Sequence, residues 1–152
     1  MSVNLPQEDV AMPSDLQPLG LAIKRVQHRH HRTLDAALIE VGTTLAQWDA
    51  LRAIARHPES SSHKLAGLTF QTDQSFGALA NRMVDRGLIR RVAGEGRAIL
   101  HHLTPEGEAM LAAGHGVADR LLAASFAPLN KAERQQLQAL LAKLLGDDAA
   151  RA

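Results

Sequence analysis

Apolar positions in the first third of the chain recur at spacings of three and four residues, the pattern of an amphipathic helix. The apolar stripe begins at Leu16 and continues to Val41, and only His30 interrupts it. Gly42 follows directly and is expected to end the helix. The preceding residues 1–15 contain two prolines and little periodicity, so they are predicted to form a loose arm.

Three shorter helices are predicted between residues 44 and 87. Thr44, followed by Gln47 three residues later, resembles a capping box that opens a helix ending before Pro58. The serines at 60–62 supply N-cap oxygens for a short third helix. Either Thr72 or the aspartate after it can cap a fourth helix, which Gly87 is placed to terminate. The apolar positions of that fourth helix are Phe76, Leu79, Ala80 and Met83.

The pattern then changes to two strand-like segments, 88–92 and 98–103, with Gly-Glu-Gly at the tip of a hairpin between them. Thr104 and Pro105 are a hydroxyl cap and a first-turn proline, which begin a fifth helix that runs toward Phe126. Asn130 with Glu133 opens a leucine-rich sixth helix that ends at residue 146, and residues 147–152 are predicted to be a frayed tail.

This order predicts a mainly α fold with a small β-hairpin wing. Residues 44–104 are predicted to form a winged helix-turn-helix region, a motif that places one helix in the major groove of DNA. Residues 16–43 and 105–146 are predicted to form a dimerisation region, because their apolar stripes exceed what the winged-helix core can cover. A monomeric six-helix bundle is the alternative.

Composition narrows the class of protein. Hydrophobic residues make up 45% of the 152 residues but aromatic residues only 3%, which favours helices over a β-sandwich. The absence of cysteine excludes disulfides, thiolate zinc sites and thiol-based redox sensing. With no apolar run of membrane-spanning length and no secretory signal, the chain is expected to be cytoplasmic and to have no membrane partner.

The formal net charge is only +1, but the positive charge is concentrated in one part of the chain. Residues 45–103 carry eight Lys or Arg against five Asp or Glu, and the stretch 82–97 carries five arginines against two acids. A local basic patch on a nearly neutral chain is what phosphate attraction requires. A solvated charged surface is the alternative.

Side chains that can bind DNA are predicted at three places. The fourth helix offers base-reading or phosphate-binding side chains on its polar side: Gln74, Ser75, Ala78, Asn81 and Arg82. Ser61, Ser62 and Thr72 stand at helix N-termini, where free backbone N–H groups bind phosphate. Arg90 and Arg97 lie in the hairpin, and Arg97 at the tip suits a narrow minor groove. Alternatively, the hydroxyl side chains only cap their helices, and the polar side chains of the fourth helix and Arg97 pair with Asp85 or Glu95.

The eight histidines raise two further hypotheses. His28 and His31 are one helical turn apart, but no carboxylate pair or cysteine stands beside them, so a solvated or interface-lining cluster is favoured over a metal site. No metal ion or cofactor is therefore predicted. His30 or His31 together with Trp48 is predicted to line an effector pocket.

Three stretches resemble a known family. They are TLAQWDAL in the second helix, DQSFGALANRMVDRGLI from the fourth helix into the first strand, and GEGRAILHHLTPEGEAML from the wing into the fifth helix. From Thr44 through Leu145 the chain is similar to the MarR family of bacterial transcriptional regulators. Glu95-Gly96-Arg97 stands where that family's wing usually reads Asp-x-Arg, and Phe70 stands where its turn usually holds glycine.

The resemblance implies a two-fold dimer built by the terminal helices and a pair of winged helices that bind an operator. It also implies release of DNA by small aromatic or phenolic ligands, bound between the dimerisation and DNA-binding regions. The sequence is thus interpreted as a ligand-responsive repressor acting on a pseudo-palindromic operator and not as an enzyme. Alternatives from other classes are a histidine-rich metal-binding protein or hydrolase, and a ligand-independent architectural DNA binder. The first of these lacks support from a Gly-rich phosphate loop, a Gly-x-Ser-x-Gly turn or an HExxH motif.

Overall fold

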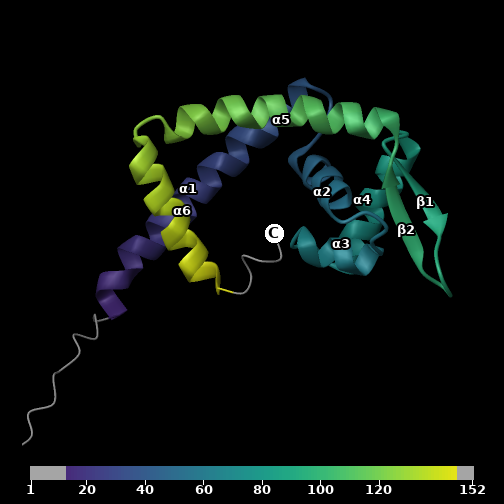
Figure 1. Ribbon diagram of the computed structural model, residues 1–152, viewed down its shortest axis with the longest axis horizontal. Helices are drawn as coiled ribbons and strands as arrows, with labels where there is room; N and C mark the ends of the chain where they lie inside the picture. Colours follow the sequence, from purple (N-terminus) through teal and green to yellow (C-terminus); the bar gives the residue numbers. More distant parts are fainter. Residues whose placement is uncertain (1–12, 147–152) are drawn as a thin grey trace, which may run out of the picture.

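The structure, a computed structural model, describes residues 13–146 as six helices and one hairpin (Figure 1). The elements are α1 (Pro13–Glu40), α2 (Leu45–Arg56), α3 (Ser62–Leu68), α4 (Asp73–Asp85), β1 (Ile89–Ala93), β2 (Ile99–Leu103), α5 (Pro105–Phe126) and α6 (Lys131–Leu145). Figure 1 shows α5 as a long helix that connects a lobe made of α2–α4 and the hairpin with α6 at the opposite end. The predicted fold class is confirmed.

One predicted segment boundary is wrong, and two predicted segments lie partly or wholly outside the described residues. Residues 13–15, assigned to a loose arm from their prolines, belong to α1, because proline is tolerated in the first turn of a helix. The rest of the predicted arm and the predicted frayed tail at 147–152 lie outside the described residues.

Local capping fixes most of the helix starts. The side chains of Thr44, Ser61, Thr72, Thr104 and Asn130 each accept a hydrogen bond from the backbone N–H three residues further on. At Asn130 the reciprocal bond from the backbone to Glu133 completes a capping box.

The capping box predicted at Thr44 is only half formed. The side chain of Gln47 does not return to the backbone of Thr44. Its Oε1 instead accepts hydrogen bonds from Thr43, at 3.2 Å, and from Arg86, the C-cap of α4. Tertiary partners have therefore displaced the local one.

The end of α4 positions the first strand. Gly87 adopts φ +71°, and its N–H bonds the carbonyl of Val84 while the N–H of Leu88 bonds the carbonyl of Met83. This pair of bonds is a Schellman motif, for which glycine is favoured because other residues are strained at positive φ. Leu88 then leads into β1, which pairs antiparallel with β2 in the register Ile89↔Leu103 to Ala93↔Ile99.

Two apolar clusters form the core. The larger lies within the lobe and joins α2, α3, α4 and the base of the hairpin around Phe76, Leu51 and Met83. The smaller connects this lobe to α1 and α5 around Trp48 and Leu38. Gly114 of α5 lies against the indole of Trp48. Because glycine has no Cβ, the backbone of α5 can pack closely on the ring there.

The terminal helices leave apolar surface uncovered. No residue of α6 is buried, and Leu144 is 72% exposed. On α1 the stripe residues Leu16, Leu19, Ile23 and Val26 are also exposed. The six helices therefore do not close into a bundle that buries these stripes within one chain. Within residues 13–146, no helix is long and apolar enough to span a membrane.

Candidate nucleic-acid interface

Helix α4 separates its apolar and polar residues onto two faces. Phe76, Leu79, Ala80 and Met83 are buried against the lobe. All five side chains predicted to contact DNA from this helix are exposed on the other side: Gln74, Ser75, Ala78, Asn81 and Arg82. Burial of one face holds the helix in place, so the polar face is presented to solvent on a fixed support.

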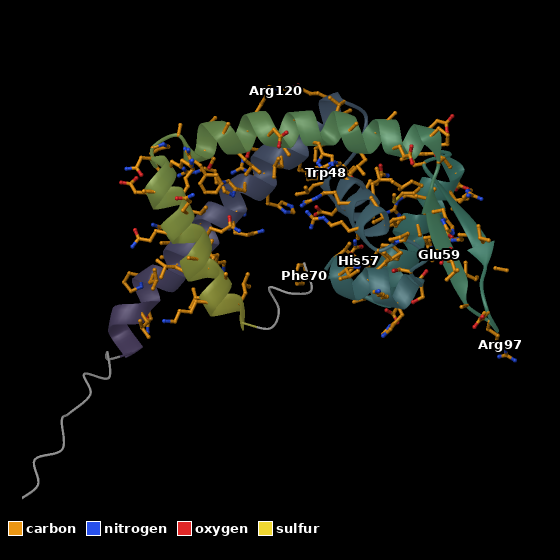
Figure 2. All side chains as sticks on the ribbon, viewed as in Figure 1. Trp48, His57, Glu59, Phe70, Arg97 and Arg120 are labelled. Carbon is orange, nitrogen blue, oxygen red and sulfur yellow. The ribbon has the colours of Figure 1, made fainter. Side chains whose placement is uncertain are left out.

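The wing is tied to this face through its first strand. The side chains of Arg90 and Arg91 point to opposite sides of the hairpin, as neighbours on a strand do. Arg91 points toward α4, where its Nη1 donates a hydrogen bond of 2.8 Å to Oδ1 of Asn81. Arg90 lines a groove on the other side of the hairpin. Arg97 is exposed at the hairpin tip, far from the helices (Figure 2).

The N-termini of α3 and α4 lie beside each other. An exposed contact of 3.0 Å between His63 Nδ1 and Asp73 Oδ2 joins the first turns of the two helices. Ser61 and Thr72 act as the N-caps, and Ser62 Oγ lies 3.3 Å from Nε2 of the buried His101. Free backbone N–H groups at a helix start attract anions. The two helix starts therefore add groups that can bind phosphate beside the polar face of α4.

Neither Arg82 nor Arg97 forms an ion pair within the described part of the chain, where the ion pairs are Arg52–Asp49 and His63–Asp73. The alternative pairings with Asp85 and Glu95 are therefore not formed. Both guanidinium groups remain available to a phosphate or a base edge.

A groove of about 470 Å³ lies between α2, the hairpin and α5. Its walls combine apolar side chains with titratable ones: Ile54, Pro58, Arg90, His101, His102, Leu103, Glu108, Leu111 and His115 among them. The size and mixed lining suit a small organic molecule that carries one polar or charged group.

Comparison with known proteins identifies the family. A family model described as MarR family matches residues 41–98. The crystal structure of a probable transcriptional regulator from Pseudomonas aeruginosa is 32% identical, with 84% of this chain and 97% of that chain covered and a TM-score of 0.72. The chain belongs to the MarR family. As a member, it is a transcriptional regulator with a winged-helix fold, and the predicted resemblance is confirmed.

A mycobacterial repressor is similar to this MarR-family protein over most of the chain. The HTH-type transcriptional repressor Rv2887 of Mycobacterium tuberculosis is 29% identical over 136 residues, which cover 88% of this chain and 98% of the relative. Its crystal structure in complex with DNA has a TM-score of 0.71 at 26% identity, covering 84% of this chain and 97% of that one. Its complex with salicylic acid has a TM-score of 0.72 at 28% identity, covering 86% and 98%.

The residues predicted to line an effector pocket are not brought together in the MarR-family structure. Trp48 is only 3% exposed, and its Nε1–H donates to the carbonyl of Leu111 at 3.3 Å. His30 Nε2 forms a hydrogen bond of 2.6 Å with Ser125 Oγ, and His31 is exposed. None of the three lines the groove between α2, the hairpin and α5.

A metal site at the histidine cluster finds no support either. Among the residues that the structure describes, no three His, Asp or Glu side chains lie close enough together to hold a metal ion. His28 and His31 therefore lack a third protein ligand there.

Sequence reasoning missed two residues that support the candidate interface of this MarR-family protein. Arg86 joins the C-terminal end of α4 to Gln47 and to the carbonyl of Gly42. His101 is fully buried and joins β2 to the start of α3. In the sequence, His101 lies between Leu100 and His102 in a strand-like segment and alternates with Ile99 and Leu103, which is the pattern of residues on one side of a strand.

Proposed function

We propose that this MarR-family protein is a repressor that binds a pseudo-palindromic DNA operator as a homodimer and releases it when a small aromatic acid or phenol binds. One observation carries the proposal: the polar face of α4 is fully exposed and unpaired with acids, while its apolar face is fully buried. Such a helix is a rigid reading element on a near-neutral chain, as expected of a cytoplasmic regulator and not of an enzyme.

The roles of the side chains follow from their chemistry. Gln74 and Asn81 can pair with adenine and Arg82 with guanine, each good pair contributing roughly 1 to 3 kcal/mol of discrimination. Ser75 and Ala78 lie on the same exposed face, where they allow close approach. Further contacts come from the hydroxyls and the hairpin: Ser61, Ser62, Thr72 and Arg97, with Arg90 on the groove side.

The dimer is proposed from the uncovered stripes of α1 and α6. Leucines that remain exposed on helices this apolar indicate a surface that another protein covers. Two-fold pairing through these helices would present two copies of α4, and operators read by such pairs have half-sites about one DNA turn, ~34 Å, apart.

The effector is proposed to occupy the groove between α2, the hairpin and α5. Arg90 and His102 offer cationic or donor groups to a carboxylate or phenol, and Leu111 offers apolar contact to a ring. A ligand there would lie between the wing and α5, the helix that leads to the proposed dimer contacts. Crystal structures of Rv2887 contain salicylic acid and p-aminosalicylic acid, so both are suitable first probes.

The DNA-binding proposal is tested by anisotropy with a duplex from upstream of the gene. Replacing Arg97 with alanine should weaken binding across all sequences and reduce the salt slope by about 1, whereas Asn81→Ala should alter preference at particular base pairs. Arg120→Ala is the matched control, since Arg120 is an exposed arginine on α5 that points away from the wing and α4 (Figure 2). The site assignment is wrong if Arg97→Ala and Asn81→Ala both bind like the Arg120→Ala control.

Dimer and effector are tested separately. Leu144→Asp should lower the dimer fraction in sedimentation analysis without loss of helical circular dichroism, because the side chain of Leu144 is 72% exposed in the single chain. Salicylate should weaken operator binding in the parent and less so in Arg90→Ala. An unchanged affinity with every small aromatic acid would instead favour a ligand-independent architectural DNA binder.

A further inference from the structure

His101 is a buried, hydrogen-bonded histidine at the junction of three elements of the lobe. It lies on β2 with no exposed surface. Its Nδ1 is 3.0 Å from the carbonyl oxygen of Ser60, and its Nε2 is 3.3 Å from Oγ of Ser62. The ring edge contacts Phe76 of α4, with centroids 6.1 Å apart. The imidazole therefore connects the wing, the start of α3 and the core side of α4.

The partners of the ring determine where its hydrogen lies. A carbonyl oxygen only accepts hydrogen bonds, so Nδ1 of His101 must carry the hydrogen that it donates to Ser60. In a neutral ring Nε2 then has only a lone pair. The hydroxyl of Ser62 must donate inward to Nε2, which leaves its hydrogen unavailable to a phosphate oxygen.

We propose that His101 is a positioning residue for the phosphate contact at the start of α3 and that it takes up one proton when the protein binds DNA. The proton from solvent binds Nε2, which then donates to Oγ of Ser62. The hydroxyl hydrogen of Ser62 is thereby released to rotate outward and donate to a phosphate oxygen. This inference rests on the proposed DNA-binding function.

The electrostatics of the site set the direction of the effect. Burial lowers the pKa of His101 most, and the charges of Arg91 and His102 lower it further, while the hydrogen bond to Ser60 opposes them. The groups that contact the ring from α3 and α4, Ser62 and Phe76, carry no charge. Three further titratable groups line the same groove as His101: Arg90, Glu108 and His115. Glu59 and His63 are sequence neighbours of Ser60 and Ser62, which contact the ring.

Free protein at neutral pH therefore holds His101 neutral, and a phosphate brought to Ser62 raises the pKa of the imidazole. A group that binds its proton more tightly in the complex makes affinity rise as pH falls between the two pKa values. One proton taken up corresponds to at most about a tenfold change in Kd per pH unit.

The test measures the Kd of the operator duplex from pH 6 to pH 8.5 at constant ionic strength. The parent should bind several-fold more tightly at the acidic end. His101→Asn retains a donor for Ser60 but has no titrating ring, so it should lose the part of the slope that belongs to this site. Ser62→Ala should lose the same part, and the double variant should be no flatter than either. His63→Gln is a control for another exposed histidine near the interface and should retain it.

A second measurement keeps the inference testable if His101→Asn does not fold. Nitrogen-detected NMR of the imidazoles should show Nε2 of His101 unprotonated in the free parent protein and protonated in the DNA complex. Slopes in His101→Asn and Ser62→Ala equal to the parent's, or a ring that stays neutral in the complex, would overturn the inference while leaving the proposed function intact. A parent that binds no operator DNA at any pH would overturn both.

Discussion

Replacement of Gly114 by alanine should destabilise the fold, because α5 passes directly over the indole of Trp48 at this residue. A Cβ at this position would lie 2.1 Å from Nε1 and 2.2 Å from Cδ1 of Trp48, far inside van der Waals contact. The indole has little freedom to retreat. It is 3% exposed, its Nε1–H is bonded to the carbonyl of Leu111, and the guanidinium of Arg52 lies 4.5 Å from the ring centroid.

The size of the effect follows from three contributions. Overpacking of a well-filled core costs roughly 1 to 3 kcal/mol. An indole pushed off its acceptor leaves a buried donor unpaired, which costs about 1 to 3 kcal/mol more. Alanine is about 1 kcal/mol better than glycine in a helix interior, which offsets part of this. Gly114→Ala should therefore lower the free energy of unfolding by about 3 kcal/mol.

The assay is urea unfolding followed by circular dichroism at one fixed protein concentration, which matters for a chain expected to dimerise. Gly116→Ala is the matched control two residues along the same helix, where the nearest atom to a Cβ is the flexible end of Arg120 at 3.7 Å. That variant should be unchanged or gain up to about 1 kcal/mol. Equal unfolding midpoints for the two variants would refute the packing argument.

Three further changes test other parts of the structure. Phe70→Gly should stabilise the fold by up to about 1 kcal/mol in thermal unfolding, because Phe70 holds φ +56° and is 98% exposed; a loss of stability would contradict this. Thr104→Val should cost about 1 to 2 kcal/mol, because it removes the N-cap of α5 and a hydrogen bond to the carbonyl of Gly87; an unchanged melting temperature would show that water replaces both. Burial raises the pKa of Asp49 from its ordinary value of 3.8 against the opposing charge of Arg52, so the contribution of this group to stability should fall as pH rises through the folded pKa. Asp49→Asn should remove that contribution to the pH profile above pH 3.8, and a profile identical to the parent's would count against it.

The helices could be predicted because their determinants are local. Thr72 caps α4, Gly87 ends it, and the four predicted apolar positions between them face the core. Signals within one segment therefore determine where the helix begins, where it ends and which side it buries. The hairpin was found within one residue for the same reason, since a glycine at φ +65° lies in its tip. Its register also pairs Arg90 with His102, which places two polar residues together on the groove side.

The groove between α2, the hairpin and α5 could not be predicted, because periodicity shows which face of a helix is apolar but not which element packs against it. Trp48 is predicted from the sequence to line a pocket with His30 or His31, yet α5 covers its indole. His102 and His115, which do line the groove, come from β2 and α5 and meet only when the lobe packs under α5. The polar face of α4 could be predicted without this information, because it is the side of the helix opposite the apolar positions that are buried.

Arg86 shows how residues distant in sequence complete the support of α4. One guanidinium nitrogen donates to Oε1 of Gln47 and another to the carbonyl of Gly42, partners 39 and 44 residues away in sequence. Thr43 donates to the same Oε1, so this oxygen joins the loop after α1 to the C-terminal end of α4. Hydrogen bonds to a charged group are worth roughly 1.5 to 3 kcal/mol each, so α4 cannot shift relative to that loop without losing a measurable part of the fold's stability. The orientation of the polar face of α4 is therefore tied to the position of α1, the helix whose apolar stripe is left uncovered.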